Sequence, residues 1–114
     1  MTDDIHYELT LMRNFFREDN IDWILEKEHG AEYVLFYLKL CLETMATEGI
    51  LIRKIGNKLI PYDVKKIAEI TNTKIAVVAT AMKLFEEIGL IEIAASGEIN
   101  VKRIGTIGLF CECG

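Results

Sequence analysis

The side chains of this sequence that could do chemistry are mainly cations, and they gather in its second half. Residues 49–106 hold nine lysines and arginines against six acidic residues, whereas residues 1–48 hold four against eleven. Lysine and arginine bind phosphate oxygens, so this asymmetry favours a nucleic acid as a partner of the second half. The net charge of −5 limits the expected affinity, because the chain as a whole repels phosphate.

The candidate contacts fall into two sets. One set lies on or before the outer side of a predicted helix, where lysine can contact guanine and hydroxyls can contact phosphate. The other set is expected to hold phosphates without reading sequence. The alternative for both is an ordinary solvated surface, and Glu86 and Glu87 on the same helix would repel phosphate. The candidate DNA-binding residues are Lys58, Lys65, Lys66, Thr73, Lys74, Thr80, Lys83, Lys102 and Arg103.

No arrangement of residues predicts catalysis, a cofactor or a metal ion. The sequence has no Gly-rich phosphate loop and no G-x-S-x-G motif, so we do not expect an enzyme. Cys111 and Cys113 are one residue apart, whereas a zinc site usually needs a Cys-x₂₋₄-Cys pair and a second pair. His6 and His29 lack ligand spacing, and we interpret the two thiols as incidental. Cys41 is expected to be a small core residue.

The elements that position the cations are predicted from apolar spacing. Helical periodicity covers residues 62–70 and 74–88, with a turn between them and Thr73 as the expected cap of the second helix. Gly89 then ends that helix, and two strands, 90–94 and 98–101, follow around a Ser-Gly turn. Helix, turn, helix and hairpin in this order predict a mainly α fold with a small β-hairpin, a winged helix-turn-helix.

The first half of the chain is predicted to be helical and apolar. A helix opening at Asp19 or Asn20 ends at Gly30, and a second helix spans residues 31–46. In the helix at 31–46, apolar side chains form one stripe along the helix and also occupy other parts of its circumference. This pattern indicates either a central helix covered on several sides or a face reserved for a partner. The candidate oligomer-interface residues are Phe36, Tyr37 and Leu40. Between this helix and Pro61, residues 50–52 are predicted to be a short strand that pairs with the hairpin, and 53–58 a basic turn; residues 7–11 are a further candidate strand.

The length of 114 residues suits one domain. We expect a winged-helix domain at 1–104 and a tail at 105–114, the tail looking truncated. No apolar run reaches the length of a membrane helix, and the acidic N-terminus does not look like a signal peptide. Three cysteines make no disulfide framework, so a cytoplasmic protein is expected.

Three segments together carry a family resemblance, over about residues 8–103. NFFREDNIDWILEKEHG, AEYVLFYLKLCLETM and KIAEITNTKIAVVATAMKLFEEIGLIEI, in this order, resemble the N-terminal domain of phage replisome organisers, relatives of the DnaD-type primosome proteins. The resemblance implies a winged-helix fold, a role in initiating DNA replication at duplex origin DNA, and a homo-oligomer. It also implies a C-terminal region, with no counterpart here, that contacts DNA and replication partners such as helicase loaders.

Two hypotheses from different classes follow. The first is a replisome organiser N-terminal domain that associates with itself and contacts DNA weakly. The alternative is a protein-interaction or oligomerisation module that does not bind DNA, favoured by the overall acidity and the apolar helix at 31–46. A phage-type transcriptional regulator is a further alternative, because a fold alone does not determine function.

Overall fold

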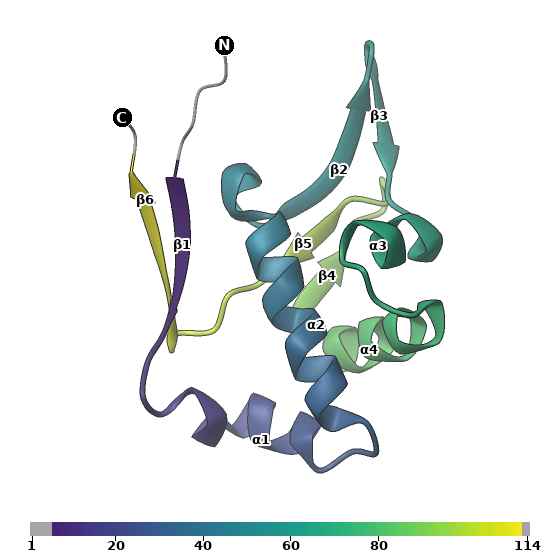
Figure 1. The fold of residues 1–114 in the computed structure, drawn as a ribbon. Helices are drawn as coiled ribbons and strands as arrows, with labels where there is room; N and C mark the ends of the chain where they lie inside the picture. The colour runs from purple at the N-terminus through teal and green to yellow at the C-terminus, as the bar shows by residue number, and fades with distance from the viewer. Residues whose placement is uncertain (1–5, 113–114) are drawn as a thin grey trace.

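The fold is organised around one long helix, α2, which runs through the centre of the molecule (Figure 1). The computed structural model describes residues 6–112. These residues form four α-helices, two short 3-10 helices and six strands. In chain order the elements are β1 (His6–Leu11), η1 (Phe15–Arg17), α1 (Asp19–Leu25), α2 (Gly30–Glu43), η2 (Met45–Thr47), β2 (Ile50–Ile55), β3 (Lys58–Pro61), α3 (Val64–Ile70), α4 (Ile75–Glu87), β4 (Ile91–Ile93), β5 (Ile99–Val101) and β6 (Ile107–Glu112).

Helix α2 is covered on several sides by α1, α4 and β1. Phe36 and Tyr37 both meet Phe85 of α4, with ring centroids 5.9 Å and 5.6 Å from it. Phe36, Tyr37 and Leu40 are fully buried, so a partner has no surface of theirs to contact. The predicted oligomer interface at these three residues is therefore corrected: they build the core of the single chain, because α2 is the central helix.

Helices α3 and α4 form as the apolar spacing predicts, except at their junction. The Asp63 carboxylate caps α3 by accepting the Lys66 amide at 2.8 Å. Gly89, with φ +79°, follows α4, and the next amide donates back to the Phe85 carbonyl at 2.8 Å, which closes the helix as predicted. The prediction that Thr73 caps α4 is wrong. Its hydroxyl donates to the Thr71 carbonyl instead, at 3.0 Å, and α4 begins without a side-chain cap.

The larger sheet has the strand order β3-β2-β5-β4, with every pair antiparallel. The predicted hairpin is confirmed, because β4 pairs with β5 and the buried residues Ile91 and Val101 lie opposite each other. β2 joins this hairpin through Ile50 and Leu51, as predicted for the short strand. β2 then continues to Ile55 and pairs with β3. The stretch predicted to be a basic turn is thus a second hairpin.

The two ends of the described chain pair with each other. β1 and β6 form a separate antiparallel ribbon from His6↔Glu112 to Leu11↔Ile107. The strand predicted at 7–11 is confirmed, whereas a strand within the predicted tail was not foreseen. Of the two cysteines in that tail, Cys113 lies outside the described residues.

The prediction of a mainly α fold is wrong. Within residues 6–112 the four α-helices are accompanied by six strands in two antiparallel sheets, which makes the fold α+β. The helix-turn-helix and its hairpin are present from α3 to β5, but β1, β3 and β6 add strands that a winged helix-turn-helix of one small hairpin does not account for. No helix in this range is long and apolar enough to cross a membrane.

Candidate nucleic-acid interface

The cationic candidates do not form one cluster. α3, α4 and the β2–β3 hairpin lie on one side of α2, while the segment that follows β5 leads to the other side, toward β6 (Figure 1). Lys58, Lys65 and Lys66 belong to the hairpin and to α3, and Thr73, Lys74, Thr80 and Lys83 belong to α4 and the turn before it. Lys102 and Arg103 follow β5. The structure therefore separates the last pair from the other candidates.

The outer side of α4 carries its candidate residues from the N-terminus to Lys83, and carboxylates at the C-terminal end. Lys74 stands at the N-cap, and Thr80 and Lys83 are exposed along the helix. Glu86 lies near the C-terminal end and helps to line a shallow pocket together with Glu92 of β4. Because these carboxylates repel phosphate, only the N-terminal part of α4 is suited to a polyanion.

The turn before α4 is held by a lysine of the central helix. The Lys39 ammonium donates to the Asn72 carbonyl at 3.3 Å and lies 3.5 Å from the Thr73 hydroxyl. Asn72 has a φ of +50°, a left-handed conformation that asparagine tolerates better than most residues. Thr73 is thus half-buried and already hydrogen-bonded, so it is a residue that fixes the turn rather than one that projects from it.

Helix α3 presents one free and one paired lysine. Lys66 donates to the Glu69 carboxylate at 2.8 Å, and this hydrogen bond and ion pair lower the pKa of that carboxyl. Lys65 is exposed, and within residues 6–112 no ion pair forms to Lys58, Lys65, Lys74 or Lys83. A phosphate would meet these four ammonium groups without displacing a carboxylate, whereas at Lys66 it would compete with one.

The backbone beside Lys102 and Arg103 is fixed by Tyr37 of α2. The Tyr37 hydroxyl donates to the Lys102 carbonyl at 2.5 Å and accepts the Ile104 amide at 3.2 Å. Burial raises the pKa of this phenol, which stays protonated as the donor requires. The Lys102 ammonium pairs with Glu92 at 3.1 Å.

Lys102 and Arg103 also line a pocket of about 400 Å³. Cys41 and Met45 near the C-terminal end of α2, Glu48, and Leu109 of β6 are among its other walls. Burial raises the pKa of the Cys41 thiol from 9.0 to about 11, so Cys41 is an inert core thiol as predicted. The two cations thus face a different part of the surface from the lysines of α3 and α4.

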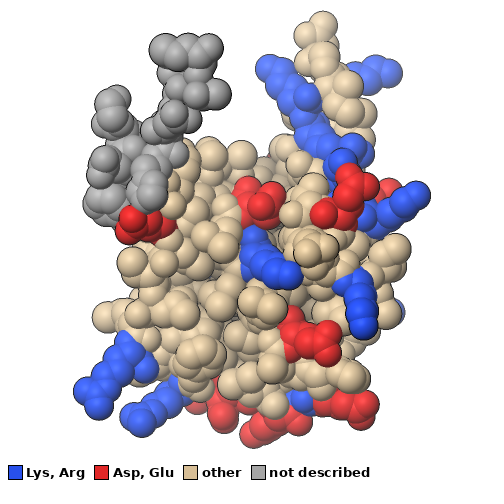
Figure 2. All heavy atoms as spheres, viewed as in Figure 1, with Lys and Arg blue, Asp and Glu red and all other residues tan. Residues whose placement is uncertain are grey.

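The hairpin of β2 and β3 adds cations and apolar residues that the sequence analysis did not select. Arg53 and Lys54 lie on β2, and Ile55 and Leu59 are more than half exposed near its end. The sequence does contain a pattern that predicts this hairpin, because Gly56-Asn57 between two apolar-rich stretches is typical of a two-residue hairpin turn. In Figure 2, Lys and Arg atoms flank this hairpin, which projects at the upper right.

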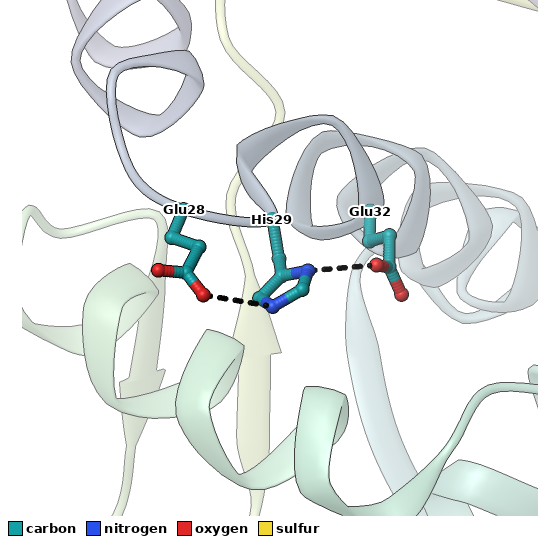
Figure 3. A network of polar contacts seen from close by, with 3 residues as sticks. All are labelled: Glu28, His29 and Glu32. Atoms are coloured by element: carbon teal, nitrogen blue, oxygen red, sulfur yellow. Dashed lines mark hydrogen bonds and ion pairs between the residues drawn. The ribbon is translucent and has the colours of Figure 1, made fainter.

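The opposite end of the molecule, around α1, is acidic. Figure 2 shows acidic atoms gathered along its lower edge. At the junction of α1 and α2, His29 lies between two carboxylates, with Nε2 3.4 Å from Glu28 and Nδ1 3.2 Å from Glu32 (Figure 3). All three side chains are exposed, and no cluster of three metal-ligand residues occurs among the side chains described, those of residues 7–109. The carboxylates at this end would repel DNA.

Comparison with known proteins bears on the family of the chain. The family model described as N-terminal phage replisome organiser matches residues 9–107. No curated protein and no solved structure matches the chain. The matched range contains every element from η1 to β5, and so all the candidate residues discussed above.

Proposed function

The chain belongs to the N-terminal phage replisome organiser family, and from this premise we propose that it contributes to the initiation of phage DNA replication by contacting duplex DNA weakly while associating with further copies of itself. The family description links the chain to phage DNA replication and to the organisation of the replisome. The contact with DNA and the self-association are the parts we add.

The observation that carries the DNA contact is a set of unpaired ammonium groups on one side of α2. Lys58, Lys65 and Lys74 are exposed and lack carboxylate partners, and the acidic end around α1 lies away from them. Each phosphate neutralised by such a cation releases condensed counterions, which favours binding at low salt. The few cations involved and the net charge of −5 keep this binding weak.

Fluorescence anisotropy with a short labelled duplex tests the DNA contact. Wild type should bind at low salt, with log K falling against log salt by about 0.9 for each phosphate contacted. Lys65→Glu with Lys74→Glu should abolish most of this binding. Arg13→Glu with Arg17→Glu makes the same change in net charge at η1 and should leave most of it intact. An absence of wild-type binding at high micromolar protein, or equal losses in both double variants, would remove DNA from the proposal.

The observation that supports self-association is an exposed apolar side of α2. Leu35 and Leu42 are 53% and 50% exposed and lie seven residues, or two helical turns, apart on the same side of the helix. Two parallel or antiparallel copies of such a stripe can bury each other's leucines. The proposed interface between copies therefore uses these residues in place of the buried Phe36, Tyr37 and Leu40.

Light scattering with variants of this stripe tests the interface. Wild type should give a mass that rises with concentration, and Leu35→Glu with Leu42→Glu should hold the chain as a monomer, because two opposed stripes would then carry like charges. Leu59→Glu, another exposed leucine, serves as the control and should not change the mass. A wild-type chain that stays monomeric at high concentration would exclude self-association and leave the DNA contact to be judged by its own titration.

A further inference from the structure

The hairpin of β2 and β3 continues well beyond the sheet that anchors it. Of β2, only Ile50 and Leu51 pair with β5, and from Ile52 onward β2 has β3 as its single partner. We call residues 52–61 the hairpin arm. In Figure 1 the arm extends past the rest of the molecule and ends in its two-residue turn. Gly56 opens this turn with φ +62°, the conformation that a tight hairpin needs.

The outer half of the hairpin arm combines lysines with exposed aliphatic side chains. Lys54 lies opposite Leu59, and Ile55 lies opposite Lys58, so each side of the ribbon carries one of each kind. Ile55 and Leu59 are 53% and 64% exposed in the part of the chain that the structure describes. Residues 50–62 include no aspartate or glutamate. Cations flank the projecting arm in Figure 2, and its end is formed by uncharged atoms.

The base of the hairpin arm is fixed, so the arm has a defined direction. Pro61 packs so closely on the β4–β5 turn that a Cβ added at Gly97 would lie 2.6 Å from the proline Cγ. The Arg53 guanidinium lies 5.4 Å from the ring centroid of Tyr62, a cation–π contact just beyond the arm. Arg53 is therefore held at the base, and the free side chains are those of the outer half.

We propose that the hairpin arm enters the minor groove of duplex DNA, where Lys54 and Lys58 hold phosphates and Ile55 and Leu59 wedge into the stacked bases and bend the duplex. This inference rests on the proposed function and adds a minor-groove contact to the phosphate contacts of Lys65 and Lys74. Aliphatic residues on a cationic arm are the side chains with which minor-groove proteins unstack base steps.

The composition of the hairpin arm disfavours the other occupants. Sequence reading in the major groove relies above all on arginine, asparagine and glutamine. Here Arg53 is held over Tyr62, and Asn57 lies in the turn and not on a strand face. Two hairpin arms from two copies would bring lysines together without an acidic residue to pair with them. A polyanion with apolar base stacks meets both kinds of side chain.

A short A·T-rich duplex with a donor and an acceptor dye at its ends tests the proposal with the full chain. Wild type should bind and raise the energy transfer by bending the duplex, and a minor-groove ligand such as distamycin should compete. Lys54→Ala with Lys58→Ala should lower the slope of log K against log salt by about 1.8. Arg13→Ala with Arg17→Ala, the matched control at η1, should leave the slope unchanged.

The aliphatic residues have their own variant. Ile55→Thr with Leu59→Thr keeps strand propensity at two exposed positions, and circular dichroism will confirm that the fold is retained. This variant should lose the bend while its salt slope stays at the wild-type value. Binding without any change in energy transfer, or wild-type behaviour of both arm variants, would overturn the proposal that the hairpin arm enters and bends the duplex. Either result would leave the proposed function standing. A loss of self-association in these variants with unchanged DNA binding would make the arm an interface between copies, and would also overturn it. If the wild-type chain does not bind the duplex, both the proposed DNA contact and the proposal for the hairpin arm are wrong.

Discussion

Replacing Tyr37 by phenylalanine should weaken the fold by a predictable amount. The Tyr37 hydroxyl serves two backbone groups on the far side of the core, donating to the Lys102 carbonyl at 2.5 Å and accepting the Ile104 amide at 3.2 Å. Tyr37→Phe keeps the ring against Phe85 and removes both bonds. It therefore isolates the polar contribution from the packing.

The magnitude follows from the two groups that lose their partner. A buried backbone group left without a hydrogen bond costs about 1–3 kcal/mol. Lys102 is exposed and Ile104 half-buried, so water reaches part of this site and the sum falls near the lower end, at about 2 kcal/mol. For a chain of this size that corresponds to a fall in Tm of roughly 8 °C.

Urea denaturation followed by the fluorescence of Trp23 measures this change. The midpoint should fall while the m value stays constant, since the surface exposed on unfolding does not change. Tyr62→Phe is the control, because within residues 6–112 its hydroxyl has no hydrogen-bond partner, and it should shift the free energy of unfolding by less than about 0.5 kcal/mol. Equal effects of the two variants would refute the reasoning that Tyr37 ties the segment after β5 to α2.

Two further predictions concern the core beside this segment. Gly49→Ala should destabilise the chain by roughly 3 kcal/mol in the same assay, because Gly49 has φ +89° and an added Cβ would lie 2.6 Å from the Val101 carbonyl oxygen. Gly89→Ala, at a positive φ with open space around it, should cost only about 1 kcal/mol, and similar losses at both glycines would contradict the argument from the close contact. Burial raises the pKa of Cys41 to about 11, so its contribution to stability is complete below about pH 9 and is lost as the pH rises through 11. The two-unit shift corresponds to about 3 kcal/mol in the free energy of unfolding. Cys41→Ala should remove the loss of stability between pH 9 and 10, below the ordinary pKa of Tyr37, and an equally steep loss there would show that another group is responsible.

The parts of the fold that local pattern determines were predictable. α4 carries apolar residues at three- and four-residue spacing and ends at a glycine, and both features depend only on neighbours in the chain. β4 and β5 were predictable for the same reason, since a short turn joins them. The hairpin of β2 and β3 has a local pattern of the same kind, the turn residues Gly56-Asn57, although the sequence analysis predicts only a turn there.

The parts that depend on distant contacts were not predictable. The periodicity of α2 shows which residues are apolar but not how many neighbours surround the helix, so Phe36 and Tyr37 could equally have faced a partner. Nothing near β6 indicates that β1, at the other end of the chain, is its partner. The candidate cations follow from residue type and order, and only the fold reveals that the segment after β5 leads away from α3 and past α2 toward β6.

The ribbon of β1 and β6 determines how the domain would respond to a mechanical load. Its strands run antiparallel, and the first and last residues of the described range, His6 and Glu112, form its outermost pair. A pull applied to both ends would therefore break the ladder one rung after another instead of shearing all rungs at once. Tension would open this ribbon at low force, and the central helix and the sheet beside it would bear the load only after the ribbon had separated.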